Sequence, residues 1–370
     1  EEARNWGICG CIEPSVPGMT DFQSNAGYFN PSKVLEITLN NGKDPLTGKQ
    51  IGPETGDVRS FTSVQQIMDA YAVQQDYFMD KFCELFDRIV SCHAWATPTI
   101  TGSCFTHGCM EKGQVLQRKG ADHRYSAVAI TGIANIADSL AAIEECVFNQ
   151  KYLSMDELMD LLATDFEGKE NMRQLLINKA PKYGNDIESV DRYAHWLTKL
   201  CNDQICKHTD GRDAKYTMVI STQSYNVVLG QLIGALPDGR KAYTALADNA
   251  SPMIGMDTNG PTAVVKSLGR IDPLLAQSGV LVNQRFDPTI VKGEKGLNII
   301  ETVIRTYFDT QHGQHIQLNV VDNETLCAAQ KEPQKYRNIL VRVAGYSAYF
   351  VDLEKDIQDN IIARTLQQSL

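Results

Sequence analysis

Residues Leu340-Val-Arg-Val-Ala-Gly345-Tyr-Ser-Ala-Tyr-Phe350 place a single glycine inside an otherwise apolar and aromatic segment near the end of the chain. Glycine weakens a strand, so a glycine in such a segment usually marks a bend or a close approach of another backbone. Its α-carbon also carries no side chain, so a radical there can become planar and delocalise between the amide nitrogen and the carbonyl group. The segment therefore permits two interpretations of Gly345, a bend and a radical store.

A second stretch, Trp6-Gly-Ile-Cys-Gly-Cys11-Ile-Glu13-Pro14, places a thiol and a carboxylate two residues apart in a segment rich in glycine and proline. If this loop is extended, Cys11 and Glu13 can point into one pocket. The thiol can act as a nucleophile or a radical carrier, and the carboxylate as a general acid or base. The alternative is a buried, inert cysteine beside a solvated glutamate, since free cysteine is among the residues buried most often.

Both stretches resemble the pyruvate formate-lyase superfamily of glycyl radical enzymes. Arg342-Val-Ala-Gly345-Tyr346-Ser347 is similar to the family's radical signature, and Gly10-Cys11-Ile-Glu13-Pro14 is similar to the cysteine loop of its lyase and dehydratase branch. The resemblance covers nearly the whole chain, and motifs that occur together in the expected order carry more weight than single motifs. Four further segments resemble the family: Gly108-Cys-Met-Glu-Lys-Gly113, Gly132-Ile-Ala-Asn-Ile-Ala-Asp-Ser-Leu140, Ala235-Leu-Pro-Asp-Gly-Arg240 and Asn283-Gln-Arg-Phe286.

The resemblance implies an α/β fold, the C-terminal half of a ten-stranded barrel in which a cysteine loop and a glycine loop meet at the centre. Residues 1–235 are expected to form this half of the barrel domain, and residues 236–370 the glycine radical domain. Full-length members are about twice as long, and their first half supplies substrate contacts. The chain has no initial methionine and enters a Gly/Cys-rich segment almost at once, so we expect a fragment that is inactive alone.

The resemblance also implies a radical relay. A radical on Gly345 takes a hydrogen atom from Cys11, the resulting thiyl radical takes one from substrate, and Glu13 moves a proton as the leaving group departs. Arg342 and Tyr346 are expected to support the radical loop, Arg342 through carboxylate or carbonyl contacts. A separate activating enzyme, which uses an iron–sulfur cluster and S-adenosylmethionine, removes the first hydrogen atom from Gly345. No bound cofactor or metal is expected, and the full-length protein is expected to be a homodimer.

The cysteine loop distinguishes branches of the family. Members that produce formate carry two adjacent cysteines, whereas Gly10 separates Cys9 from Cys11 here and Glu13 follows. This pattern favours cleavage of a C–O, C–N or C–S bond in a small polar substrate by a dehydratase or lyase. The alternatives are an arylacetate-type decarboxylase, a pyruvate formate-lyase-like acyltransferase and, outside enzymes, a short accessory protein that supplies a glycine radical domain.

Two segments depart from those of several dehydratases. They are Asp122-His-Arg-Tyr125 and Arg285-Phe-Asp-Pro288, and they argue against a simple diol or choline substrate. Ser221-Thr-Gln-Ser-Tyr225 follows a predicted strand, where it either faces substrate or merely ends the strand.

Composition excludes several other classes of protein. The chain has 370 residues, 43% hydrophobic and 22% charged, with a net charge of -10, which is unlike a nucleic-acid binder. No apolar stretch approaches the length of a membrane span, and no signal peptide is recognisable, so we expect a cytoplasmic protein. The ten cysteines are too sparse for a disulfide scaffold and lack a familiar zinc-ligand spacing.

Hydrophobic periodicity predicts long helices that alternate with short buried strands, which is typical of an α/β fold with the strands inside. The clearest helix covers residues 62–91, and the Gly/Pro-rich stretches 1–31 and 236–296 are predicted to be mainly loop. The other predicted helices are 31–41, 133–148, 155–163, 170–180, 186–207, 297–308 and 353–368, and the predicted strands are Tyr216–Ser221 and His315–Val321.

Overall fold

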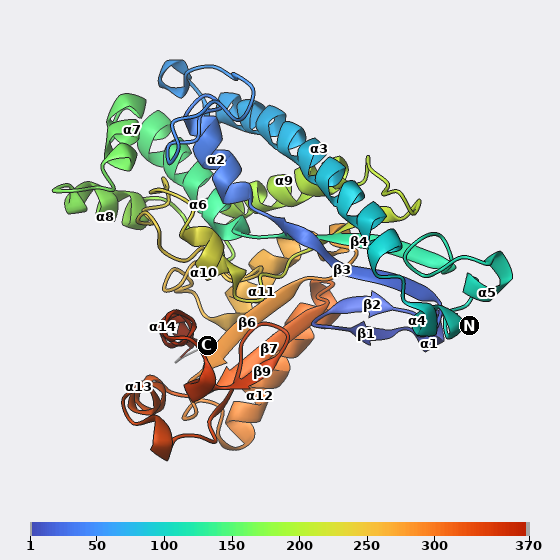
Figure 1. Ribbon diagram of the computed structural model, residues 1–370. Helices are drawn as coiled ribbons and strands as arrows, with labels where there is room; N and C mark the ends of the chain where they lie inside the picture. Colours follow the sequence, from blue (N-terminus) through green and yellow to red (C-terminus); the bar gives the residue numbers. More distant parts are fainter. Residues whose placement is uncertain (1, 368–370) are drawn as a thin grey trace.

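The computed structural model describes residues 2–367 and shows a mixed α/β fold built around six parallel strands (Figure 1). Strands β3, β4 and β5 form one sheet, and β6 pairs with β7 and with the short β10 in another. A parallel bridge between Ile220 and Val280 joins the two sheets. Within the described residues, these strands do not close into a complete barrel. The strands are β3 (Thr20–Phe29), β4 (His123–Ile130), β5 (Lys215–Val219), β6 (Leu281–Phe286), β7 (His315–Val320) and β10 (Leu366–Gln367).

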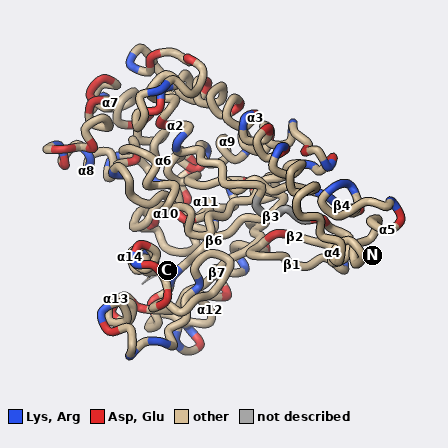
Figure 2. The backbone as a smooth tube through the Cα atoms, in the orientation of Figure 1, with Lys and Arg blue, Asp and Glu red and all other residues tan. Residues whose placement is uncertain are grey.

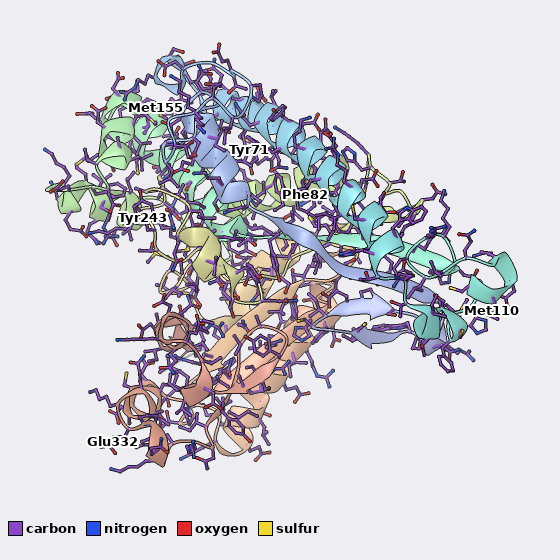
Figure 3. All side chains as sticks on the ribbon, viewed as in Figure 1. Tyr71, Phe82, Met110, Met155, Tyr243 and Glu332 are labelled. Carbon is purple, nitrogen blue, oxygen red and sulfur yellow. The ribbon has the colours of Figure 1, made fainter. Side chains whose placement is uncertain are left out.

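Helices cover the outer side of these strands. The longest, α3 (Val64–Ala96), packs against α2 (Pro31–Leu39) and β3 (Figure 3). The Tyr71 hydroxyl donates to the Pro31 carbonyl at 3.3 Å, and the ring of Phe82 meets that of Phe29 edge-on at 6.1 Å. Burial of strand faces by helices explains why parallel strands are so apolar. The other helices are α1 (Glu2–Asn5), α4 (Ile100–Cys104), α5 (Cys109–Lys112), α6 (Ile133–Ala142), α7 (Met155–Ala163), α8 (Glu170–Lys179), α9 (Glu188–Ile205), α10 (Tyr225–Gly230), α11 (Pro261–Arg270), α12 (Gly293–Arg305), α13 (Asn323–Lys331) and α14 (Lys355–Ala363).

Two short hairpins project from this body toward each other. The cysteine hairpin consists of β1 (Gly7–Cys9) and β2 (Glu13–Ser15), and the glycine hairpin of β8 (Leu340–Arg342) and β9 (Ser347–Tyr349). Gly10 and Gly345 lie in their tips with φ of 69° and 81°, a backbone conformation that glycine adopts at little cost. The cysteine motif and the glycine motif of the sequence therefore both form tight reversals of the chain.

The predicted helices and the two predicted strands are confirmed, with three corrections. Residues 1–31, predicted to be mainly loop, contain β1, β2 and β3, and residues 236–296 contain α11 and β6. The predicted helix 353–368 ends at Ala363, and Leu366–Gln367 pair with β6; residue 368 lies outside the described residues. Strand β4 was also missing from the predicted elements. Simple alternation fails in β3 and β6 because β3 shifts register between Gln23 and Gly27, and β6 buries three polar side chains.

Packing joins the two halves of the chain. One large core cluster includes Leu35 and Ile67 from the first part and Val265 and Val303 from the second. A smaller cluster, which contains Leu326, Val341, Phe350 and Ile361, fastens the glycine hairpin to α13 and α14. Charged residues of both signs are interspersed, mostly over the outer helices and loops (Figure 2). Within residues 2–367, none of the helices combines the length and apolar character needed to cross a lipid bilayer.

Candidate active site

The tips of the two hairpins are in contact. The Cys11 thiol lies 3.6 Å from the carbonyl oxygen of Ala344, to which it can donate. A Cβ atom built on Gly345 would lie 2.3 Å from the Cys11 sulfur and 2.2 Å from its Cβ, so only glycine fits here. Because that Cβ direction coincides with one of the two Cα–H bonds of glycine, one α-hydrogen of Gly345 points at the thiol. The geometry suits movement of a hydrogen atom between these two residues.

Glu13 is buried at the base of the cysteine tip and is held by the tip itself. Its Oε2 accepts hydrogen bonds from the backbone N–H groups of Cys11 and Ile12, both at 3.0 Å. Its Oε1 is buried and has no hydrogen-bond partner among the described residues. Burial raises the pKa of Glu13, while the backbone N–H groups oppose the rise by stabilising the charged form. One oxygen therefore fixes the carboxyl group, and the other remains available for proton transfer.

The thiol of Cys11 is oriented by a glutamine. Gln223 Nε2 donates to the Cys11 sulfur at 3.4 Å, and Gln223 Oε1 accepts from the Tyr28 hydroxyl at 2.9 Å. Since the sulfur accepts from Gln223, its own hydrogen is free to point at Ala344. Burial, and next the negative charge of Glu13, raise the pKa of Cys11. A protonated thiol is a poor nucleophile but a competent hydrogen-atom donor, so the surroundings favour the radical interpretation over the nucleophilic one.

Aromatic side chains line the approach to Cys11. The rings of Tyr28 and Tyr225 stack with centroids 4.1 Å apart and planes inclined by 17°. The Tyr125 hydroxyl donates to the Pro14 carbonyl, which ties β4 to the cysteine hairpin. Burial raises the pKa of both Tyr28 and Tyr125, so both hydroxyls stay neutral. The segment 221–225 therefore does reach the site, through Gln223 and Tyr225, whereas Tyr28 was not predicted.

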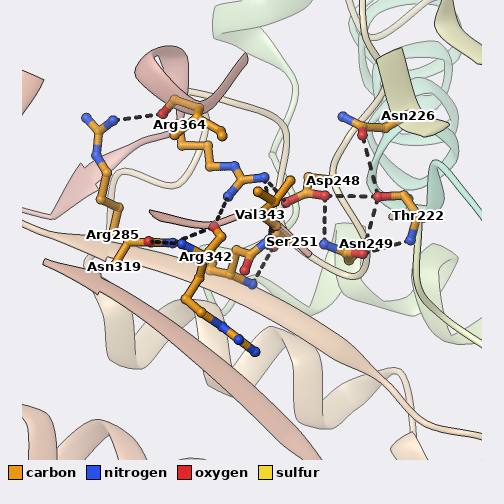
Figure 4. Close-up of polar contacts among 12 residues, drawn as sticks. Thr222, Asn226, Asp248, Asn249, Ser251, Arg285, Asn319, Arg342, Val343 and Arg364 are labelled. Carbon is orange, nitrogen blue, oxygen red and sulfur yellow. Dashed lines mark hydrogen bonds and ion pairs between the residues drawn. The ribbon is translucent and has the colours of Figure 1, made fainter. Parts of the chain in front are cut away.

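The glycine tip is held through its backbone (Figure 4). Asn319 accepts from the Arg342 N–H at 2.9 Å and donates to the Arg342 carbonyl at 3.1 Å. The Val343 carbonyl accepts from Asn283 at 3.0 Å and from Arg364 at 2.9 Å. Of these partners only Asn283 lay in a segment singled out in the sequence. Asn319 and Arg364 carry no local signal, because an isolated asparagine or arginine is usually a surface residue.

The two residues predicted to support the glycine loop, Arg342 and Tyr346, both lie in the glycine hairpin. The Arg342 guanidinium donates to the Ser347 hydroxyl at 3.1 Å, across its own hairpin, and its positive charge opposes the rise in the pKa of Cys11. Tyr346 is 41% exposed, and its carbonyl accepts from the Val343 N–H at 2.9 Å. A supporting role of both side chains in the glycine hairpin stays a prediction. Within residues 2–367, no group of three or more His, Cys, Asp or Glu side chains is arranged to hold a metal ion.

Comparison with known proteins gives matches along almost the entire chain. The family model described as pyruvate formate lyase-like matches residues 1–230, and that described as glycine radical matches residues 246–351, which include Gly345. Trans-4-hydroxy-L-proline dehydratase from Clostridioides difficile is 40% identical over 99% of this chain and 46% of its own length. Isethionate sulfite-lyase from Bilophila wadsworthia is 37% identical over 99% of this chain and 44% of its own length.

Solved structures agree with these matches. The glycerol-bound B12-independent glycerol dehydratase from Clostridium butyricum superposes with a TM-score of 0.96 and 41% identity, over 99% of this chain and 46% of that one. Hydroxyproline dehydratase from Clostridioides difficile, with its substrate bound, gives a TM-score of 0.95 and 39% identity over 100% of this chain and 46% of that one. The chain spans about half the length of these relatives. It belongs to the pyruvate formate lyase-like family and carries the glycine radical domain in its C-terminal part.

Proposed function

We propose that the protein containing this chain is a glycyl radical enzyme that cleaves a C–O, C–N or C–S bond in a small polar substrate, as a dehydratase or lyase. The observation that carries the proposal is the contact between Gly345 and the Cys11 thiol, with the unpartnered Oε1 of Glu13 beside it. A storage site, a hydrogen-atom carrier and a proton carrier thus lie within two adjoining hairpin tips.

The proposed reaction moves one hydrogen atom along this line and back. The Gly345 radical takes the hydrogen atom of the Cys11 thiol, which forms a C–H bond and leaves the radical on sulfur. The thiyl radical takes a hydrogen atom from a substrate carbon, and the neighbouring carbon loses its leaving group. Glu13 moves the proton that accompanies this loss. The product radical then recovers a hydrogen atom from Cys11, and Cys11 recovers one from Gly345, so atoms and electrons balance.

Burial and orientation supply the physical basis of this reaction. The glycine and thiol are held in contact before substrate arrives, which removes the entropic cost of bringing them together. Burial raises the pKa of Glu13, which makes its carboxyl group easier to protonate than a solvated one.

The whole protein's substrate and partners belong to the proposal. The names of the relatives, dehydratases and a sulfite-lyase, support removal of a hydroxyl or sulfite group. We also propose an activating enzyme that uses an iron–sulfur cluster and S-adenosylmethionine, a cytoplasmic location and a homodimeric full-length protein. A division into a barrel domain (1–235) and a glycine radical domain (236–370) is supported by family matches that end at 230 and begin at 246.

The test uses the intact protein under anaerobic conditions with a cognate activating enzyme. Electron spin resonance should detect an organic radical. Its signal should broaden or split further when the glycines carry ¹³C at the α-carbon, because the unpaired electron couples to that nucleus. The activated protein is then offered trans-4-hydroxy-L-proline, glycerol, isethionate and 2,3-dihydroxypropanesulfonate, and product is measured per radical. Elimination from one of these compounds supports the proposal. An activated protein that bears no carbon-centred radical on glycine contradicts it.

A decarboxylase is the second candidate, favoured by the stacked Tyr28 and Tyr225 beside Cys11, which offer an aromatic surface to a ring. Indoleacetate decarboxylase from Tractidigestivibacter scatoligenes is 31% identical over 100% of this chain and 44% of its own length. Indoleacetate is therefore added to the panel. Release of carbon dioxide from it, without elimination from the other compounds, would favour this candidate.

A further inference from the structure

Asp248 is a buried carboxylate that makes hydrogen bonds on both of its oxygens (Figure 4). Its Oδ2 pairs with the Arg364 guanidinium at 3.0 Å and accepts from Asn283 at 2.5 Å. Its Oδ1 accepts from the Thr222 hydroxyl at 2.9 Å and from Asn249 at 2.6 Å. A buried charge persists only when it is paired and hydrogen-bonded, and Asp248 meets that condition with its neighbour Asn249 and with partners from three distant segments.

One side of this network holds the glycine tip. Arg364 and Asn283 each bond Asp248 and also donate to the Val343 carbonyl, two residues before Gly345. The Arg364 guanidinium further donates to the Arg342 carbonyl at 3.3 Å. Glycine has no side chain that could anchor it, so its position is set by the carbonyls that precede it. Asp248 orients the two groups that bind the Val343 carbonyl.

The other side of the network holds the residue that orients the thiol. Thr222 donates its hydroxyl to Asp248 and its N–H to Asn249 Oδ1, the latter at 2.7 Å. The next residue, Gln223, donates to the Cys11 sulfur. Gln223 and Ser224 have φ of 46° and 77°, values that residues other than glycine keep only where the surrounding structure enforces them. The bonds of Thr222 supply that constraint directly before the strained pair.

We propose that Asp248 is a positioning residue that sets the contact between Cys11 and Gly345 from both sides at once. It acts on Gly345 through Arg364 and Asn283, and on Cys11 through Thr222 and Gln223. Its importance for hydrogen-atom transfer rests on the proposed function, but its effect on the two tips does not. A misplacement of about 1 Å can slow an oriented reaction roughly 100-fold. A carboxylate shared by both sides would hold Cys11 and Gly345 at a fixed distance from each other.

The test separates the two sides with three substitutions in the intact protein. Arg364→Lys loosens only the glycine side, Thr222→Val removes only the hydroxyl on the cysteine side, and Asp248→Asn weakens both. Hydrogen exchange of the backbone amides of residues 342–346 reports on the glycine tip. Alkylation of Cys11 by iodoacetamide, followed by mass spectrometry of its peptide, reports on the cysteine tip. Neither measurement requires a radical or a substrate.

We expect Asp248→Asn to accelerate both amide exchange and Cys11 alkylation by roughly 10-fold, whereas each single-sided variant accelerates mainly one of them. The control is Asp191→Asn, since Asp191 is also a buried carboxylate that pairs with an arginine, Arg270, at 2.9 Å and a hydroxyl, Ser267, at 2.9 Å. That variant should lower the melting temperature without selectively loosening either tip. The proposal is overturned if Asp248→Asn affects only one tip, or changes both no more than the control does.

Activity provides an independent readout once a substrate from the panel is turned over. Asp248→Asn should lower kcat per radical at least about 10-fold with little change in KM, because Asp248 acts on Cys11 and Gly345 only through other side chains. A change in KM alone would overturn the proposal. If no glycyl radical forms even in the unaltered protein, the proposed function fails, while amide exchange and alkylation still decide whether Asp248 couples the tips.

Discussion

The two hairpin tips are built alike but held in opposite ways. The cysteine tip is held from within the same hairpin. Glu13 accepts hydrogen bonds from the N–H groups of Cys11 and Ile12, which precede it by two residues and one residue. The glycine tip is held by three side chains that are distant in sequence. Asn319 and Arg364 donate to the Arg342 carbonyl, and Asn283 donates to the Val343 carbonyl. The first arrangement can form with the hairpin, whereas the second exists only when β6, β7 and the segment after α14 are assembled.

The difference follows from what each residue can offer. A cysteine loop that also carries a carboxylate can satisfy its own backbone donors, so local sequence is enough to shape it. A glycine offers no side chain, and its precise position must come from contacts to neighbouring carbonyls. We therefore expect substitutions in the cysteine tip to impair the transfer of a hydrogen atom or a proton directly. Substitutions around the glycine tip should instead act by displacing Gly345.

Gly345→Ala should give the largest effect. An added methyl group would lie 2.3 Å from the Cys11 sulfur, at a φ of 81°, and the α-carbon could no longer become a planar glycyl radical. We expect no radical signal by electron spin resonance and no turnover. The matched control is Gly48→Ala, which has a φ of 69° but no atom within 4 Å of the added group, and should cost only about 1–2 kcal/mol of stability. A normal radical signal in Gly345→Ala would contradict the assignment.

Cys11→Ala should come next. The radical on Gly345 should still form, because the activating reaction does not require the thiol, but turnover per radical should fall by roughly 10⁴-fold or more. Spin quantification together with product analysis checks both parts. Cys9→Ala is the control, since Cys9 is exposed and should leave turnover nearly unchanged. Turnover that survives in Cys11→Ala but not in Cys9→Ala would reverse the roles of the two thiols.

Glu13→Gln should lower turnover by about 10²- to 10⁴-fold while the cysteine tip keeps its shape. The amide oxygen of glutamine can still accept from the Cys11 and Ile12 N–H groups, but the side chain can no longer move a proton. The measurement is the pH profile of kcat, in which the limb due to Glu13 should disappear. Fast alkylation of Cys11 in this variant would instead show that the tip had opened.

The same substitution has a predictable effect on stability. Because burial raises the pKa of Glu13 in the folded state, its favourable contribution is complete at low pH and is lost as the pH rises through that raised pKa. The stability of Glu13→Gln relative to the unaltered protein should therefore increase with pH across that range. Chemical denaturation at several pH values measures it, and a difference that falls with rising pH would contradict the burial of this carboxyl group.

Asn319→Ala should give the smallest effect, a local loss of about 1–3 kcal/mol, because it removes two hydrogen bonds from the Arg342 backbone. Amide exchange at Arg342 should accelerate while the melting temperature changes little. Asn178→Ala is a suitable control, since Asn178 is exposed and bonds only its own helix. Equal exchange at Arg342 in the two variants would show that the glycine tip does not depend on remote contacts.

The sequence predicted much of this molecule where the signal was local. Hydrophobic periodicity located α3 and the other long helices, because each helix repeats its apolar face within a few residues. It missed β6, in which Asn283, Gln284 and Arg285 are all buried, because those side chains bond other segments and interrupt any alternation. It likewise gave no indication of Asp248, whose partners besides its neighbour Asn249 come from three distant places in the chain.

By itself, the sequence determined the chemical groups of the proposed relay and the loops that carry them: Cys11 and Glu13 in one tight reversal and Gly345 in another. These are local properties, since glycine permits the turn and Glu13 lies within reach of its own backbone donors. Only the tertiary structure decided that the two tips meet and which side chains hold them there. That contact depends on β6, β7 and Arg364 reaching the same carbonyls, a juxtaposition that no short stretch of sequence encodes.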